Sequence, residues 1–475
     1  MALEKQNQTI DLQWCRSYLS DKIFKLRPED YQKEHPIWPG MVGIEIEMMP
    51  LDESLLSSTG AMIPLLGDGS LQSNLKNMLP ENRLWQPQGT ESVYSSIKLE
   101  DEDQLTFEPG GQLEYSSKPY PCLDDACKRT AYLQKTLNSH FSKQGVRFLQ
   151  MGSHPWQSAE DIGLQMTKPR YQAMNKYFTR IGPFGKRMMR ETCTIQVNLD
   201  FGGSEEKMAK RFLVANLMAP VLTAMFAHSP VSEGRPNGFK SVRAHIWQNL
   251  DRGRTGFPKL SNILEAMDQK SCVDSYLDMV LDANVVFVEG QDFAVPESDT
   301  SFRSWVKDGI DGVYPSEDDF VTHLSLHFPE VRARGFMEIR SIDSQAPAWQ
   351  LAPACLLTGV LYNDDSLEQA FDLLVGQIGN IEELWAASTK GLENLVLHDF
   401  AAKIMYLALQ GFSKLPSCYE GKGRRRVLER FNEHFTSKGR CPADDILDAL
   451  EASGEDQLSA EVLFKVQDKW LKLVS

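Results

Sequence analysis

The sequence lacks the cysteine pattern of a disulfide framework or a zinc site. Its eight cysteines are spread over 475 residues without a CxxC pair, and the closest two are Cys122 and Cys127. Thiols scattered in this way are typical of a reducing compartment. The first residues also lack the apolar core of a signal peptide. We therefore expect a cytoplasmic protein.

Long apolar runs and an excess of positive charge are missing as well. No uninterrupted apolar stretch is long enough to span a bilayer. Asp and Glu number 65 against 50 Lys and Arg, a formal charge of −15 that disfavours a nucleic-acid surface. Hydrophobic residues at 42% and charged residues at 24% are ordinary globular values. We expect neither membrane nor nucleic-acid partners.

The usual phosphate-binding loops are also absent. The sequence contains neither GxxxxGK[ST] nor GxGxxG, so a bound nucleotide would need a different cradle. The most informative glycines lie instead in residues 107–116, where Pro109-Gly110-Gly111 separates Glu108 from Glu114. A glycine pair in an extended run marks a bend or a close backbone approach.

Four stretches share one alternating pattern. In residues 42–49 apolar side chains alternate with glutamates, and residues 107–116, 192–201 and 335–341 repeat the pattern. Alternation with a period of two predicts strands with an apolar face and a polar face. The polar faces carry Glu45, Glu47, Glu108, Glu114, Gln196, Asn198, Glu338 and Arg340.

Each polar face has a simple alternative explanation. Glu45 and Glu47 could be a solvated strand face, and Glu338 with Arg340 a surface ion pair of little energetic weight. If the strands form one sheet, however, its polar side concentrates five glutamates, which repel one another without a cation such as Mg²⁺. Arginines in residues 232–258 and 332–340 would then bind phosphates or substrate carboxylates. This combination predicts a magnesium–nucleotide enzyme.

The remaining pattern predicts a helix-rich chain. Apolar residues at helical spacing predict helices over 11–26, 122–143, 204–227 and 272–281, and an almost wholly helical chain from about 348 to the end. Further strands are expected at 146–152 and 285–288. We expect surface loops over 51–104, with a short helix near 70–79, and an irregular basic segment over 232–258.

The motifs together resemble a known family. They are Phe107-Glu108-Pro109-Gly110-Gly111-Gln112-Leu113-Glu114, Thr192-Cys193-Thr194-Ile195-Gln196-Val197-Asn198-Leu199-Asp200, Arg243-Ala244-His245-Ile246-Trp247, Phe328-Pro329-Glu330-Val331-Arg332 and Met337-Glu338-Ile339-Arg340. In this order, across residues 41–362, they look like the glutamate–cysteine ligases of the plant and bacterial type.

The resemblance implies an α+β fold related to glutamine synthetase and the guanidino kinases. Its curved, mainly antiparallel sheet would have a polar face shaped as a funnel, with helices packed on the other face. Residues 1–362 would form the catalytic core. The helical residues 363–475 would pack on the same domain.

The resemblance also implies a reaction. ATP would phosphorylate the γ-carboxylate of glutamate, and the amine of cysteine would displace phosphate from the γ-glutamyl phosphate. A γ-glutamyl ligase with another amine acceptor, a guanidino-kinase-like phosphotransferase and a catalytically inactive paralogue stay open as alternatives. Monomer and dimer are equally compatible with the sequence.

Roles carried over from the family cover four groups. Ligands of Mg²⁺, or of Mn²⁺, would be Glu45, Glu47, Glu108, Glu114, Gln196 and Glu338. Arg340, with Glu338, would act on the transferring phosphoryl group. The nucleotide would contact Asn198, Lys168, Arg170 and Arg332. Substrate contacts would come from Arg243, His245, Trp247 and Arg254.

The sequence departs from the plant pattern at two places. Plant members carry arginine directly before Thr-Cys-Thr, where this chain has Glu191 preceded by Arg190. After Arg340, the plant Gly-Ala-Asp-Gly-Gly is replaced by residues 341–345, Ser-Ile-Asp-Ser-Gln. Both differences fall near expected substrate positions, so the acceptor amine is left open.

Overall fold

A nine-stranded sheet runs through the protein. The computed structural model describes residues 9–27, 33, 38–90, 92–421 and 423–474. The strand order is β10-β11-β7-β1-β5-β4-β3-β2, and β6 pairs with the far end of β1. The strands are β1 Val42–Asp52, β2 Gln86–Gly89, β3 Tyr94–Lys98, β4 Gln104–Phe107, β5 Leu113–Ser116, β6 Val146–Leu149, β7 Thr194–Leu199, β10 Val331–Ala333 and β11 Met337–Asp343.

The four strands singled out in the sequence are consecutive neighbours in the sheet. Antiparallel pairing sets Glu47 opposite Glu114, Glu45 opposite Gln196, and Glu338 opposite Asn198. Residues that are directly opposite on antiparallel strands project from the same face. The predicted strands are therefore confirmed, and their polar side chains share one face of the sheet.

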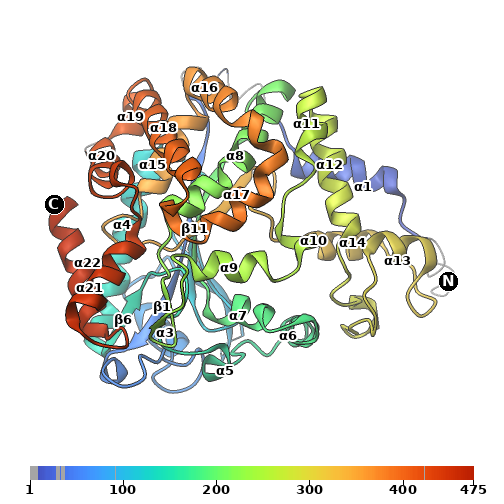
Figure 1. Ribbon diagram of the computed structural model, residues 1–475. Helices are drawn as coiled ribbons and strands as arrows, with labels where there is room; N and C mark the ends of the chain where they lie inside the picture. The colour runs from blue at the N-terminus through green and yellow to red at the C-terminus, as the bar shows by residue number, and fades with distance from the viewer. Residues whose placement is uncertain (1–8, 28–32, 34–37, 91, 422, 475) are drawn as a thin grey trace.

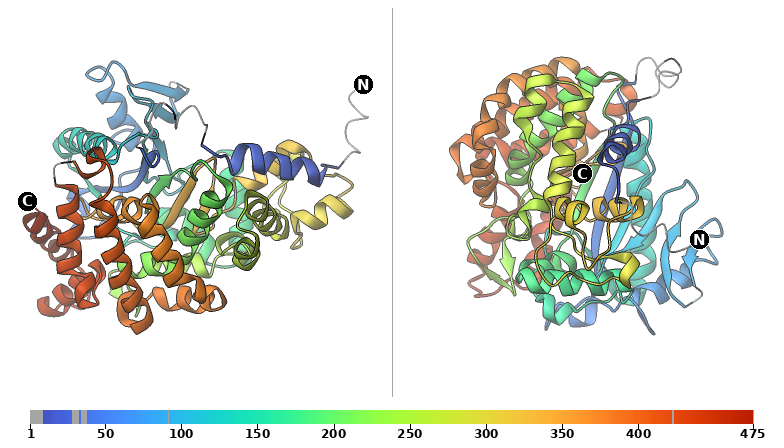
Figure 2. Two further views of the ribbon diagram at one scale, coloured as in Figure 1. Left: turned by 90° about the horizontal axis from the view of Figure 1, so that it is seen from above. Right: turned by 90° about the vertical axis from the view of Figure 1, so that its right-hand side faces the viewer.

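Helices cover the apolar face. The helix α8, Glu205–Met225, is capped at its N-terminus by Ser204 and is buried along most of its length. It packs on β11, while α15 (Ala352–Leu361) reaches β7 and α4 (Leu123–Phe141) reaches β1. Figures 1 and 2 show the C-terminal helices, orange to red, gathered on this side of the sheet. The expected helices over 122–143 and 204–227 are confirmed.

A second apolar cluster lies over part of the polar face. It is built from α6 (Pro169–Ile181), α7 (Phe184–Glu191) and α9 (Val242–Gln248), together with apolar residues of segments 286–295 and 326–328. We call this cluster the roof, because together with the polar face it encloses a cavity. The three helices are held over the carboxylates by apolar packing with one another.

The C-terminal region is helical, as expected. It contains α16 Asp364–Leu374, α17 Ile381–Ser388, α18 Leu395–Phe412, α19 Ser417–Glu420, α20 Arg424–His434, α21 Pro442–Ser453 and α22 Ala460–Val474. Other helices are α1 Leu12–Tyr18, α3 Leu71–Met78, α5 Ala159–Ile162, α10 Arg252–Thr255, α11 Leu260–Ala266, α12 Gln269–Asp282, α13 Phe302–Asp308 and α14 Glu317–Leu324. Among the described helices, none is long and apolar enough to cross a membrane.

Three expectations about local structure are wrong. Residues 86–104, expected as loops after the helix near 70–79, form β2, β3 and the start of β4, because pairing in the sheet satisfies their backbone groups even along the fully exposed edge strand β2. Residues 285–288 form no strand; the run is apolar because Val286 and Phe287 pack into the roof and Val285 and Val288 into the main core. The basic segment 232–258 is not irregular, since it contains α9 and α10.

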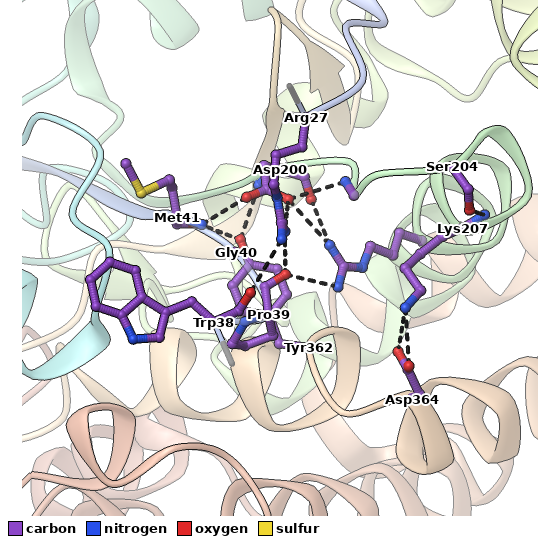
Figure 3. A network of polar contacts seen from close by, with 12 residues as sticks. Arg27, Trp38, Pro39, Gly40, Met41, Asp200, Ser204, Lys207, Tyr362 and Asp364 are labelled. Atoms are coloured by element: carbon purple, nitrogen blue, oxygen red, sulfur yellow. Dashed lines mark hydrogen bonds and ion pairs between the residues drawn. The ribbon is translucent and has the colours of Figure 1, made fainter. Parts of the chain in front are cut away.

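A polar network joins the start of β1 to the end of β7 (Figure 3). Asp200, just after β7, accepts hydrogen bonds from Arg27 at 2.6 Å and from the Met41 amide at 2.7 Å. The hydroxyl of Tyr362 donates to the Met41 carbonyl and accepts from the Asp200 amide. The network fixes the register in which β1 enters the sheet, and with it the positions of Glu45 and Glu47.

Candidate active site

A cavity of about 230 Å³ lies between the polar face of the sheet and the roof. Its polar side carries glutamates and arginines, and its other side is largely apolar. The lining consists of Glu45, Glu47, Glu108, Pro109, Gln112, Glu114, Arg170, Tyr171, Met174, Met188, Met189, Thr192, Gln196, Trp247, Leu326, Phe328, Arg332, Arg334 and Arg340.

Three carboxylates converge in this cavity. One oxygen from each of Glu47, Glu108 and Glu114 lies within 4.8 Å of the other two. Glu47 comes from β1 and Glu114 from β5, while Glu108 sits in the turn between β4 and β5. That turn needs its glycines: Gly111 has φ +91°, and a Cβ on Gly110 would lie 2.4 Å from the Arg190 carbonyl oxygen.

Burial makes Glu45, Glu47 and Glu108 hard to ionise together. Burial raises the pKa of Glu47 to about 7, even though Arg340 and the Thr194 amide favour its charged form. Burial also raises the pKa of Glu108, and the neighbouring Glu114 and Glu47 charges raise it further. The pKa of Glu45 is raised in the same way, by burial and by Glu338 and Glu114. Such a cluster is costly without a compensating positive charge.

The donor set fits a hard divalent cation. Mg²⁺ prefers carboxylate oxygens and keeps open positions for water or phosphate oxygens. Glu47, Glu108 and Glu114 can each offer one oxygen from a different part of the sheet. Gln196 stands beside them, with its amide nitrogen 3.3 Å from Glu47 Oε1. The residues present therefore fit the metal expected from the sequence.

Arginines occupy the other half of the polar wall. Arg332, Arg334 and Arg340 all line the cavity, and each donates to the buried carboxylate of Glu338 at 2.5–3.0 Å. Burial opposes ionisation of Glu338, but the arginines outweigh it and hold its pKa well below the usual range. Arg340 also donates to Gln196 Oε1 at 2.5 Å. This wall offers positive charge to an anionic ligand.

Glu338 and Asn198 lie on the polar face of the sheet. Neither is among the described residues that line the cavity. Glu338 is fully buried beneath the arginines. Asn198 donates to Glu45 Oε1 at 2.6 Å and so orients that carboxylate. As a metal ligand and a nucleotide contact, respectively, they stay predictions.

Four more residues were predicted to contact nucleotide or substrate, but they are not among the described residues that line the cavity: Lys168, Arg243, His245 and Arg254. Lys168 is the exposed residue before α6, and His245 stacks on Phe239 with ring centroids 4.0 Å apart. Arg254 is fully buried and donates to the carbonyls of Leu326 and Asn284. Arg243 is 2% exposed and donates to the Arg340 carbonyl. Arg170, Arg332 and Trp247, by contrast, do line the cavity.

The apolar side of the cavity could not be predicted from the sequence. Met188 and Met189 of α7 and Met174 of α6 lie there beside Leu326 and Phe328. Their helices could be predicted from periodicity, but nothing in the sequence indicates that their apolar faces pack above a polar sheet face. Gln112 was also missed; its amide nitrogen bonds the carbonyls of Arg190 and Thr192.

The two departures from the plant pattern have structural partners of their own. Glu191 accepts from the Ala159 amide at 2.8 Å and pairs with Arg187 at 2.9 Å. Arg190 donates to the Ala159 carbonyl and to Asn175. Neither Arg190 nor Glu191 is among the described residues that line the cavity. Asp343 lies buried under hydrogen bonds from Ser229 and Ser241.

Comparison with known proteins agrees with the motifs. The profile of the glutamate–cysteine ligase family 2 matches residues 41–462. The chain belongs to this family. The resemblance seen in the sequence is thereby confirmed, and the match extends about 100 residues beyond the motifs into the helical C-terminal region.

Curated members of the family include chloroplastic plant enzymes. The chain is 35% identical over 272 residues to the glutamate–cysteine ligase of Arabidopsis thaliana, covering 57% of this chain and 51% of that protein. It is 29% identical over 404 residues to glutamate–cysteine ligase B of rice, Oryza sativa subsp. japonica, covering 82% of this chain and 78% of that protein. The match thus spans about half of the Arabidopsis protein.

A solved structure shares the fold. The glutamate–cysteine ligase of Francisella tularensis, crystallised in complex with AMP, superposes with a TM-score of 0.52 at 13% identity. The superposition covers 92% of this chain and 91% of that one. The expected mixture of helices with an antiparallel sheet is confirmed at this level.

Proposed function

We propose that the protein is an ATP-dependent ligase that joins the γ-carboxylate of L-glutamate to the amine of L-cysteine through γ-glutamyl phosphate. The observation that carries this proposal is the convergence of Glu47, Glu108 and Glu114 within 4.8 Å, in a cavity that also holds Arg332 and Arg340. A carboxylate cluster opposite an arginine wall suits phosphoryl transfer, where positioning and charge stabilisation do most of the catalysis.

The arginine wall would bind the anionic substrates. Arg332 and Arg340 are fixed by Glu338, so little side-chain entropy is lost when they bind a phosphate or carboxylate oxygen. Arg340, held between Glu338 and Gln196, is our proposed catalytic residue for the transferring phosphoryl group. Arg170 and Arg332 are proposed nucleotide contacts, and Trp247 a substrate contact.

Glu47, Glu108 and Glu114 would hold Mg²⁺, with Glu45 and Gln196 beside them. When bound, the ion would neutralise phosphate charge during transfer. The glutamates themselves would orient the site, because pairing of β1 with β5 fixes the backbones of Glu47 and Glu114, and the turn that carries Glu108 leads directly into β5. The apolar roof would exclude water, which protects a reactive acyl phosphate from hydrolysis.

Three wider assignments belong to this proposal. Residues 1–362 would be the catalytic core, related in fold to glutamine synthetase with a funnel-shaped polar face, and residues 363–475 would pack on the same domain. The cytoplasm would be its location, supported by eight cysteines that are all unpaired thiols. The plant relatives carry the description chloroplastic.

Product analysis tests the function. The purified protein is incubated with ATP, Mg²⁺ and glutamate, first alone and then with cysteine, other amino acids and simple amines, and products are identified by mass spectrometry. We expect ADP, phosphate and γ-glutamylcysteine only when cysteine is present. A γ-glutamyl product with another amine but not with cysteine would change the acceptor. A stable phosphorylated guanidine, or no turnover at all, would refute the ligase assignment.

A further inference from the structure

A second cavity lies between the C-terminal helix α22 and β6, which are neighbours in Figure 1. Its volume is about 1050 Å³, against about 230 Å³ for the cavity that holds the carboxylates. The walls come from the loop after β1, from β6, from Trp156, and from the first half of α22 with the loop before it. We call it the α22 cleft. Among the described residues, none lines both this cleft and the carboxylate cavity.

Hydrogen bonds between distant segments fix the aromatic wall of the cleft. Trp156 Nε1 donates to the Leu458 carbonyl at 2.6 Å, and the Leu458 amide donates to the Gly234 carbonyl at 2.7 Å. The Gly234 amide in turn donates to the Pro155 carbonyl at 2.7 Å. The Trp156 ring also lies against Gly60, where φ is +59° and a Cβ would clash with ring atoms. The ring therefore has one fixed position in the wall.

A half-buried cation in the cleft lacks an acceptor. Arg147 of β6 lines the cleft, and its guanidinium lies over the Phe464 ring, 3.5 Å from the ring centre. Within the described part of the chain, its side chain makes no hydrogen bond or ion pair. Burial opposes its charge and lowers the pKa of Arg147. A guanidinium in such a place can bind an anionic group through charge-assisted hydrogen bonds.

An anion shares the cleft with this cation. Asp468 follows Phe464 by one turn of α22, so the two side chains lie on the same face of the helix. The charge of Asp468 acts on Arg147, but the two side chains form no ion pair. Among the described residues, the Asp468 carboxylate has no other hydrogen-bond or ion-pair partner. The cleft thus holds a cation and an anion apart, and a ligand that carries both charges can bind both.

The lining disfavours a ligand with many charges of one sign. Side chains of both signs contribute to it: Arg147, Arg235 and Lys465 against Glu455, Asp456, Glu461 and Asp468. A polyphosphate would meet the carboxylates, and a polycation the arginines. Trp156, Phe464 and Leu56 supply apolar surface, and the volume is at the upper end of the range of ligand sites. A zwitterion larger than a single amino acid, with an apolar side chain, fits these features.

We propose that the α22 cleft is a second ligand site, which binds short peptides with free termini. The peptide carboxylate binds Arg147, the ammonium group binds Asp468, and an apolar side chain packs on Trp156. The site takes part in no reaction, and its test needs no turnover. The outcome is therefore independent of the proposed ligase activity.

Calorimetry with dipeptides tests the site in the whole chain. Glycylglycine, glycyl-L-leucine and glycyl-L-phenylalanine are titrated into the protein without ATP or Mg²⁺. Glycyl-L-leucine is also compared with two blocked forms, its N-acetyl derivative and its C-terminal amide. The variants are Arg147→Gln and Asp468→Asn. The controls are Glu47→Gln in the carboxylate cavity and Arg303→Gln on α13, where the native side chain is exposed and pairs with Asp278 and Asp282.

We expect glycyl-L-leucine to bind saturably with a Kd of about 1 mM or below, and more tightly than glycylglycine because of its apolar contact. Each blocked form should bind at least about tenfold more weakly, since one charge-assisted contact is lost. Arg147→Gln should weaken binding of the free dipeptide and remove its advantage over the amide. Asp468→Asn should likewise remove its advantage over the N-acetyl derivative. Both controls should keep the wild-type Kd.

Three results would overturn the proposal. The first is no saturable binding of any of the three dipeptides up to about 10 mM. The second is equal affinity for free and blocked glycyl-L-leucine. The third is a wild-type Kd in both Arg147→Gln and Asp468→Asn; weaker binding by Glu47→Gln would then place the peptide in the carboxylate cavity. Asp468 is exposed, so Asp468→Asn decides if Arg147→Gln fails to fold.

Discussion

The side-chain amide of Gln112 donates a hydrogen bond to the backbone carbonyl of Thr192 at 3.1 Å. The same nitrogen reaches the carbonyl of Arg190 at 3.0 Å. These two bonds tie the turn that carries Glu108 to the last turn of α7 and to the residue that follows it. The position of Glu108 in the carboxylate cluster is thereby linked to the position of α7, which carries Met188 and Met189.

Gln112→Leu should loosen this link. The substitution keeps the size of the side chain but leaves buried carbonyls of Arg190 and Thr192 without their donor, which costs about 1–3 kcal/mol for each unsatisfied group. Thermal and urea unfolding should show the loss. The exposed Gln369, which bonds only its own helix, provides the control Gln369→Leu. Equal stability of both variants would contradict the account.

Gly110→Ala should be destabilising for a steric reason. Its Cβ would lie 2.4 Å from the Arg190 carbonyl oxygen and 2.6 Å from the Arg190 Cα, so backbone would have to move. Overpacking of this kind costs about 1–3 kcal/mol. Gly290→Ala is the matched control, because that Cβ would meet nothing within 4 Å. We expect a lower melting temperature for Gly110→Ala alone.

Glu108→Gln should separate stability from metal binding. Burial and the neighbouring Glu114 and Glu47 raise the pKa of Glu108, so its ionisation opposes folding above the usual range of a glutamate. The neutral variant should therefore melt at a higher temperature than the wild type at pH 8 without Mg²⁺. Adding MgCl₂ should raise the melting temperature of the wild type only, since a ligand stabilises the state that binds it.

Potassium chloride at matched ionic strength controls for screening in that experiment. A wild-type melting temperature that responds no more to MgCl₂ than to KCl would remove the support for a metal site. An equal response in Glu108→Gln would exclude this residue as a ligand.

Acid should destabilise the fold partly through His154. Burial lowers the pKa of His154 to about 3 from an ordinary 6.5, so the unfolded chain binds this proton more readily than the folded protein. Stability should therefore fall as pH drops below 6.5, by up to about 1.4 kcal/mol per pH unit from this group.

His154→Asn removes the titration and keeps the local hydrogen bonds. Nδ1 of His154 accepts from the amides of Trp156 and Gln157, and an asparagine oxygen can accept from amides two and three residues ahead. We expect a shallower loss of stability between pH 6.5 and 4 in the variant. Parallel pH profiles for variant and wild type would show that His154 does not carry this dependence.

Much of the sheet could be predicted because its strands alternate strictly. Along their strands Glu45, Glu47, Gln196 and Glu338 alternate with apolar residues, so period-two patterning revealed both faces. The hairpin around Gly110 followed from turn chemistry. Strand β2 could not be found in this way, because all four of its residues are exposed at the sheet edge and show no alternation.

The environments of the arginines could not be predicted from the sequence. Arg332 and Arg340 line the cavity, whereas Arg243 and Arg254 bond backbone carbonyls in the interior. All four are charged residues near family motifs, and residue type alone cannot distinguish these environments. The apolar side of the cavity was missed for a related reason: Met188 packs like a core residue, and only the fold places it above the carboxylates.

Glu114→Gln tests whether the carboxylate cluster serves a ligase reaction. Glutamine keeps the shape and can still accept from Thr106 Oγ1, which lies 2.6 Å from Glu114 in the native protein. The measurement is γ-glutamylcysteine formed from ATP, glutamate and cysteine with Mg²⁺, with circular dichroism confirming the fold. We expect product from the wild type and a loss of at least about 100-fold in the variant. Near wild-type turnover by Glu114→Gln, or no γ-glutamylcysteine from the wild type, would contradict it.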